Sequence, residues 1–156
     1  MNTTLFAKAA NGSAPSPYQG GFTVTLLTHD DIPAFLELQQ TIQNDLPNEH
    51  KHHLKVRTHE DLTSHLDAGM PLIGVKCDDE RLVGQVLMSF ADNKAAKNLE
   101  GYPIHGQEKD VTAIVQSVGI HPAFRGKPYN LSSILHREIV AQAQQFDKSI
   151  LMAKVS

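Results

Sequence analysis

The chain has 156 residues, 40% of them hydrophobic and 20% charged, and a net charge of −3 with neutral histidines. This length and apolar content predict one globular domain with one core. A nucleic-acid binder usually has an excess or a stripe of basic residues, and this chain has neither, so we expect no nucleic-acid partner. No apolar run reaches the roughly 18 residues of a membrane span. The single Cys77 excludes an intramolecular disulfide, and no secretion signal opens the chain, so we expect a cytoplasmic protein with no membrane partner.

The N-terminal part of the chain divides into a polar tail and a first strand. Residues 1–21 are rich in Ala, Asn, Gly, Ser and Pro, which predicts a flexible segment with little to bury. Residues 22–156 form the domain proper. Its first strand is Phe22–Leu27, where β-branched and apolar residues predominate.

Two helices are predicted next. The first opens at Thr28, carries Pro33 in its first turn and ends before Pro47, because the residue preceding a proline avoids the α conformation. The second opens at Thr58 and closes at Gly69, a favourable helix-terminating residue.

Three strands follow in succession. Leu72–Cys77 and Arg81–Ala91 are apolar runs joined by a short polar turn, and a long polar connection, Asp92–Lys109, leads to Val111–Ile120. Both faces of this last run are mostly apolar, which predicts a central strand. Strict alternation would place one set of its side chains on the same face, namely Thr112, Ile114, Gln116, Val118 and Ile120.

A third helix and a fifth strand complete the pattern. The helix starts at Tyr129 and carries an apolar stripe at helical spacing, and the strand is Ile150–Val155. The order is therefore β-α-α-β-β-β-α-β. The final strand–helix–strand unit predicts a parallel pair, and the middle strands are expected to be antiparallel. The fold class is α+β, with one mixed central sheet that ends after its fifth strand.

The segment from Ser117 to Leu131 reads S-V-G-I-H-P-A-F-R-G-K-P-Y-N-L. It resembles the coenzyme A-binding segment of the GNAT superfamily, where a central strand ends in a pattern like V-x-P-x-[YF]-R-G before a glycine-rich turn and a helix. The element order over residues 22–156 agrees with that family. The resemblance implies a GNAT-like sheet and an acetyl-CoA-dependent N-acetyltransferase, in which a primary amine attacks the thioester directly.

The resemblance also implies a binding site. A helix N-terminus offers free N–H groups to the pyrophosphate of the coenzyme. The backbones of Val118 and Ile120 would pair with the pantetheine arm, and the N–H of Val118 would stabilise the oxyanion. Tyr129 either covers the coenzyme or is an ordinary amphipathic helix residue. The implied cofactor-binding set is Val118, Ile120, Arg125, Gly126, Lys127, Pro128, Tyr129, Asn130 and Ser133.

The phosphate loop departs from the family pattern [RQ]-x-x-G-x-[GA] at both glycine positions. Pro128 stands at the first and removes an N–H donor, which the first turn of a helix tolerates. Asn130 stands at the second, where we expect its side chain to cap the helix or to bind a phosphate.

The family normally continues beyond the fifth strand with a helix and two more strands, which often supply a tyrosine general acid. We therefore expect a C-terminally incomplete domain: a fragment, a chain completed by a partner, or a degenerate member. An unfinished sheet exposes an edge, which favours a homodimer.

Gln116 occupies a place where family members often carry a basic or acidic residue near the amine. Glutamine takes up no proton, so water or another carboxylate would have to act as the base. The alternative is an ordinary hydrogen-bonded strand residue. The amine acceptor is expected near the first two helices and the polar stretch Asn48–Arg57.

Three histidines, His50, His52 and His53, share that stretch without a carboxylate fixed beside them, so we expect no metal site. A second functional hypothesis is a non-catalytic module that binds CoA or another protein and retains the fold. The altered loop and the glutamine favour this alternative.

Overall fold

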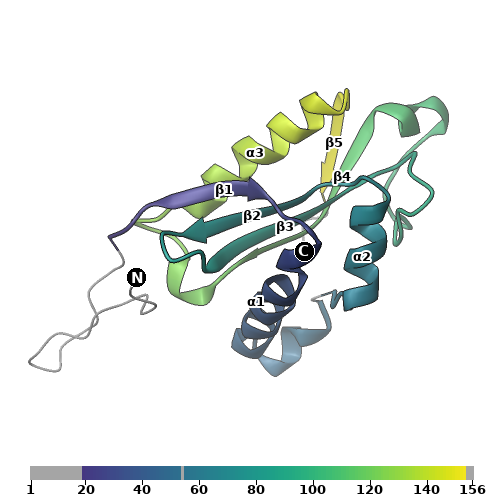
Figure 1. Ribbon diagram of the computed structural model, residues 1–156. Helices are drawn as coiled ribbons and strands as arrows, with labels where there is room; N and C mark the ends of the chain where they lie inside the picture. The colour runs from purple at the N-terminus through teal and green to yellow at the C-terminus, as the bar shows by residue number, and fades with distance from the viewer. Residues whose placement is uncertain (1–18, 54, 154–156) are drawn as a thin grey trace, which may run out of the picture.

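The computed structural model describes residues 19–53 and 55–153. Most of the predicted flexible segment, residues 1–21, therefore lies outside the described part, and its flexibility stays a prediction. The strands and helices follow one another in the predicted order (Figure 1). Their bounds are β1 Phe22–Leu26, α1 Ile32–Asp45, α2 His59–Asp67, β2 Leu72–Cys77, β3 Leu82–Phe90, β4 Thr112–Ile120, α3 Leu131–Gln145 and β5 Ile150–Ala153.

The five strands form one mixed sheet in the order β1-β2-β3-β4-β5. The first three pairings are antiparallel, and β4 pairs in parallel with β5. This confirms the predicted α+β class, the antiparallel middle strands and the parallel final pair.

Helices cover both faces of the sheet (Figure 1). On one face α3 packs over a core that includes Val75, Val86 and Leu135. On the other face α1 and α2 cover a second core that includes Phe35, Leu62 and Leu87. The sheet is therefore the middle of three layers. All nine residues of β3 are buried and β3 is its middle strand, while β4, predicted to be central, is the interior strand between β3 and β5.

The helix starts follow local sequence signals, with one difference. The Thr58 hydroxyl accepts from the Asp61 N–H at 3.1 Å, while the Asp61 carboxylate accepts from the Thr58 N–H at 2.9 Å, which is a capping box. The third helix begins at Leu131, two residues later than predicted, because Asn130 adopts the left-handed conformation with φ 57°. A residue in that conformation cannot continue a right-handed helix.

A β-bulge in β4 overturns the predicted alternation of its side chains. The pairing with β3 passes from Leu87–Ser117 directly to Met88–Val115, so Gln116 is an extra residue. Directly paired residues of antiparallel strands share a face. Val118 lies opposite a residue of the α3-side core, whereas Gln116 bonds to Ser89 on the α2 side. The prediction that Gln116 and Val118 share a face is therefore wrong, because the bulge shifts the period by one residue.

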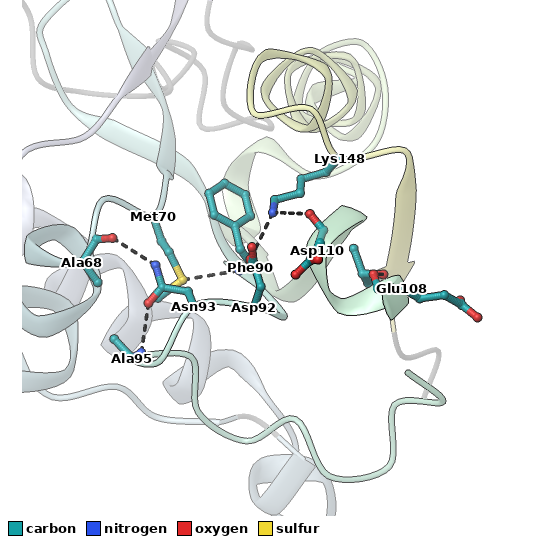
Figure 2. Close-up of polar contacts among 10 residues, drawn as sticks. Ala68, Met70, Phe90, Asp92, Asn93, Ala95, Glu108, Asp110 and Lys148 are labelled. Atoms are coloured by element: carbon teal, nitrogen blue, oxygen red, sulfur yellow. Dashed lines mark hydrogen bonds and ion pairs between the residues drawn. The ribbon is translucent and has the colours of Figure 1, made fainter. Parts of the chain in front are cut away.

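Polar contacts fix both ends of the long β3–β4 connection (Figure 2). At its start, Asn93 donates to the Ala68 carbonyl at the end of α2, at 3.0 Å. Lys148 joins the two ends: it donates to Asp92 at 3.0 Å and to the Asp110 carbonyl at 2.8 Å, and its Nζ lies 5.0 Å from the centre of the Phe90 ring. These contacts hold the connection against the sheet and α2.

Candidate functional site

The first part of the candidate site is an unpaired edge in the second half of β4. The parallel pairing with β5 covers only Thr112–Val115, and the bulge at Gln116 follows at once. Among the described residues no strand pairs with β4 beyond that point on the β5 side. Val118 lies on this edge with 52% of its surface exposed.

The hydrogen-bond pattern shows which backbone groups point away from the sheet. The His121 N–H donates to the Val83 carbonyl at 2.8 Å, so His121 and Val83 form a hydrogen-bonded pair. Hydrogen-bonded and non-hydrogen-bonded pairs alternate along an antiparallel ladder. Ile120 and Val118 are therefore in non-hydrogen-bonded pairs with β3. Their N–H and C=O groups point outward along the open edge, as an extended ligand needs.

Arg125 lies beside this edge and is already engaged. Its Nε donates to the Ile120 carbonyl at 3.2 Å, and its Nη1 donates to the Asp45 carboxylate at 2.9 Å. The second contact ties the loop before α3 to the end of α1. The predicted role of Arg125 toward a phosphate stays a prediction, and binding would require this side chain to share or exchange its partners.

The loop itself differs from the predicted arrangement in two details. Pro128 lies three residues before α3 rather than in its first turn, and the Lys127–Pro128 peptide bond is cis. Asn130 makes no side-chain capping bond, and its N–H donates to the Gly126 carbonyl at 2.9 Å. The prediction that Pro128 occupies the first helical turn is wrong, because Asn130 in the left-handed conformation delays the helix. Asparagine tolerates that conformation better than most residues.

The remaining loop residues divide between the core and the surface. The Tyr129 ring packs against Phe22 and Phe124, with ring centres 5.9 and 5.0 Å away, so it contributes to an aromatic cluster under the loop. Lys127 and Ser133 are exposed, and the Ser133 N–H donates to the Asn130 carbonyl at 3.2 Å. The start of α3 therefore has exposed side chains on both sides of Leu131, which is itself buried.

A second part of the site lies on the opposite face of β4, between α2 and the sheet. A cavity of about 100 Å³ opens there beside Gln116. The Gln116 Oε1 accepts from the Ser89 hydroxyl, and its Nε2 donates to the Lys97 carbonyl at 2.7 Å. The interpretation of Gln116 as a hydrogen-bonded strand residue thus has direct support, and its place near the amine acceptor stays a prediction.

Arg57 lines the same cavity and was not singled out from the sequence. Its main chain is held by the Gln39 amide, which accepts from the Arg57 N–H at 2.8 Å and donates to its carbonyl at 2.9 Å. Only 7% of Arg57 is exposed, and its Nε and Nη2 atoms have no hydrogen-bond partner among the described residues. Its partner Gln39 is 18 positions away in sequence, so no local pattern signals this burial.

Burial and charge shift the pKa values of groups in this region. Burial lowers the pKa of Arg57, although Asp61 and Tyr102 nearby act in the opposite direction. Burial is also the main cause that lowers the pKa of His65, and the charge of Arg57 adds to it. The Nε2 of His65 lies 2.9 Å from the Pro71 carbonyl, so the neutral ring donates through Nε2.

His121, at the end of β4, is half-buried. Its Nδ1 accepts from the Ala123 N–H at 3.1 Å, which fixes the ring at the start of the loop. Burial lowers its pKa, and Arg81 and Arg125 add to the effect.

The expected absence of a metal site and of a membrane partner stays a prediction. No group of three metal-ligating side chains gathers among the residues that the structure describes, and the side chains of His52 and His53 lie outside that part. None of the described helices has the length and apolar character to cross a bilayer.

The chain matches no family model and no curated protein sequence, but its fold is shared with many solved structures. An aminoglycoside antibiotic 6'-N-acetyltransferase from Acinetobacter baumannii has a TM-score of 0.59 at 12% identity, over 87% of this chain and 80% of that one. An N-acetyltransferase from Staphylococcus aureus has a TM-score of 0.60 at 13% identity, over 85% and 72%. An aminoglycoside N-acetyltransferase solved in complex with CoA has a TM-score of 0.61 at 11% identity, over 90% and 80%. The chain therefore shares the fold of these N-acetyltransferases, in agreement with the fold that the sequence resemblance implies.

Proposed function

We propose that this chain is an acetyl-CoA-dependent N-acetyltransferase that acetylates a primary amine. The observation that carries the proposal is the open edge of β4, where the backbone groups of Val118 and Ile120 point outward just beyond the bulge. An extended pantetheine arm pairs with such an edge as a strand would. The shared GNAT fold, with one neighbour in complex with CoA, supports the same reading.

In the proposed reaction the amine nitrogen attacks the thioester carbonyl carbon. The carbonyl oxygen becomes an oxyanion, which the N–H of Val118 stabilises by a hydrogen bond. The C–S bond then breaks, CoA leaves as a thiolate that takes up a proton, and the amine loses a proton to solvent. Gln116 accepts no proton, so its proposed contribution is to orient the acceptor beside the edge.

The proposed phosphate site is the exposed start of α3. Free N–H groups of the first helical turn and the positive end of the helix dipole favour an anion there. Lys127 and Ser133 are exposed beside it, and Arg125 lies one residue before Gly126, whose φ is +70°. The Tyr129 ring packs against the Phe124 ring and so helps to stabilise the loop. The sequence alterations Pro128 and Asn130 leave this helix end accessible, because both residues are exposed and precede the helix.

A second candidate function is a CoA-binding module without catalysis. One observation favours it: both the oxygen and the nitrogen of the Gln116 amide are already hydrogen-bonded within the protein. Such a residue contributes no acid or base to a reaction.

Two measurements separate these candidates. Calorimetric titration with acetyl-CoA tests binding, and release of free thiol over a panel of primary amines tests turnover. We expect binding that weakens about tenfold in Lys127→Gln, because one charge-assisted contact is lost. The matched variant Arg137→Gln, exposed on α3 beyond the first turn, should bind as the wild type does. Binding without turnover would favour the module, and no binding would overturn both candidates.

A further inference from the structure

The guanidinium of Arg57 is buried with two nitrogens that lack a hydrogen-bond partner among the described residues, in a cavity that Gln116 of β4 also lines. Only 7% of the residue is exposed, and two of its side-chain nitrogens are both buried and unpaired. Burying an unpaired charge is costly, so proteins normally provide a counter-charge and hydrogen bonds. Lys148, whose side chain is also largely buried, shows this rule within the same chain, because it has a carboxylate and a carbonyl as partners.

The surroundings of Arg57 favour an anion over a cation. Besides Arg57, the side chains that line the cavity include two lysines, Lys55 and Lys97, against one carboxylate, Asp61. The Asp61 carboxylate is also engaged, since it accepts from the Thr58 N–H at 2.9 Å. Arginine and carboxylate groups fit together as planar forks with two parallel hydrogen bonds.

The position of Arg57 is fixed independently of any ligand. The Gln39 side chain holds both its N–H and its carbonyl, and Gln39 is itself buried in α1. The side chain therefore projects from an anchored backbone, which is the arrangement expected for a preorganised binding group.

The cavity connects this group with β4. Gln116 lines its other side, and Val118 lies two residues further along the strand, roughly 6–7 Å at extended spacing. A cavity of about 100 Å³ has room for a carboxylate and a few more atoms, since one water requires about 10–15 Å³ on that measure. The rest of a larger acceptor would extend outside it.

We propose that Arg57 binds a carboxylate of the acceptor, and that the acceptor class is therefore a carboxylate-bearing amine such as an amino acid or a related small molecule. Naming an amine rests on the proposed acetyltransferase function. The carboxylate site itself does not, because it follows from the unpaired guanidinium and its cavity.

The site is tested first by binding alone. The Nε–H resonance of Arg57 is followed by NMR while the full chain is titrated with sodium acetate, and in parallel with acetamide, which has the same shape without the charge. We expect a saturable shift with acetate and none with acetamide. A linear or absent response to acetate would overturn the site, whether or not the protein proves to be an acetyltransferase.

Variants then separate a binding role from a structural one. Arg57→Met removes a buried charge whose hydrogen bonding is incomplete, so the midpoint of urea unfolding should stay the same or rise. The stabilisation against unfolding that acetate gives the wild type should be lost. If the methionine variant fails to fold, Arg57→Lys is measured instead. It keeps the charge, so acetate should still raise its unfolding midpoint, but by less than in the wild type. The matched control Arg137→Met, on α3 across the sheet, should keep all of the stabilisation. A lower unfolding midpoint with unchanged acetate protection in Arg57→Met would contradict the proposal.

Turnover tests the acceptor class. For amines that differ only in carrying a carboxylate or its carboxamide, such as β-alanine and its amide, kcat/KM should favour the carboxylate by about 30-fold or more. In Arg57→Met that ratio should fall to about one. If no amine is acetylated while acetate still binds, the proposed function fails and the carboxylate site stands. If carboxamides are acetylated equally well by the wild type, the proposed acceptor class is wrong.

Discussion

Replacing Val118 with proline removes one outward N–H group and leaves the pairing of β3 with β4 intact. The residue is in a non-hydrogen-bonded pair with β3, so its N–H makes no bond within the sheet. Proline is tolerated at such edge positions because no ladder bond is lost. The side chain is half exposed, so its replacement removes little buried surface. The perturbation therefore acts on the proposed oxyanion donor with little effect on the fold.

The expected effect follows from the loss of one oxyanion donor. Removing a single such donor typically lowers kcat by about 10²–10³-fold, equivalent to about 3–4 kcal/mol of transition-state stabilisation. Val118→Ala is the matched control, because it shortens the same side chain and keeps the N–H. We expect the alanine variant to retain turnover within about threefold and the proline variant to lose it.

The assay is release of free thiol from acetyl-CoA at saturating amine, with urea unfolding run in parallel on both variants. The free energy of unfolding of each variant should lie within about 1 kcal/mol of the wild-type value. A folded Val118→Pro variant that turns over acetyl-CoA as fast as Val118→Ala would refute the assignment of this N–H to the oxyanion.

Three further outcomes test the packing and the electrostatics of the fold. Gly74→Ala should destabilise the chain by about 1–2 kcal/mol in urea unfolding, because the added Cβ would lie 2.5 Å from the Leu27 Cδ2 atom; an unchanged midpoint would contradict this close approach. Lys148→Met should cost about 2 kcal/mol by the same measurement, because two charge-assisted hydrogen bonds are lost, one of them to Asp92, and a cost below about 0.5 kcal/mol would show that these contacts are dispensable. Because burial lowers the pKa of His65 in the folded chain, its contribution to stability is present above the unfolded pKa of about 6.5 and is lost as the pH falls below it. His65→Gln, which keeps a donor for the Pro71 carbonyl, should therefore flatten the decline of stability between pH 7.5 and 5.5, and an unchanged slope would contradict the shift.

The order of elements was predictable because local signals and hydrophobic patterns agree along the chain. The box at Thr58 and Asp61 starts α2 where the sequence predicts it, and Gly69, with φ 81°, lies in the left-handed conformation just after it. The apolar runs of β2 and β3 became buried strands for the same reason.

The bulge at Gln116 was not predictable from alternation. Apolar residues stand on both sides of it, so the sequence pattern reads the same with or without an extra residue. The side chain of Gln116 hydrogen-bonds to Ser89 in β3 and to the Lys97 carbonyl in the long connection. Both partners are distant in sequence, so no local pattern indicates the bulge.

Arg57 was missed for a related reason. Most of its neighbours in sequence are polar, and a charged residue in such a stretch is normally exposed. Its backbone is held by Gln39, and its cavity is lined by residues of α2 and β3; of these, Gln39 and β3 are distant from Arg57 along the chain. A buried guanidinium with two nitrogens that lack hydrogen bonds is a property of the folded chain, and it is the observation on which the proposed carboxylate site rests.

The central claim is that acetyl-CoA pairs with the open edge of β4. Amide hydrogen exchange of Val118, Gly119 and Ile120, measured by NMR with and without saturating acetyl-CoA, tests it directly. In the free protein the outward amides of Val118 and Ile120 should exchange fast, while that of Gly119, hydrogen-bonded to β3, should exchange slowly. Bound acetyl-CoA should slow Val118 and Ile120 by about tenfold or more and leave Gly119 nearly unchanged. Unchanged exchange at both outward amides in the saturated complex would contradict the claim and place the coenzyme elsewhere.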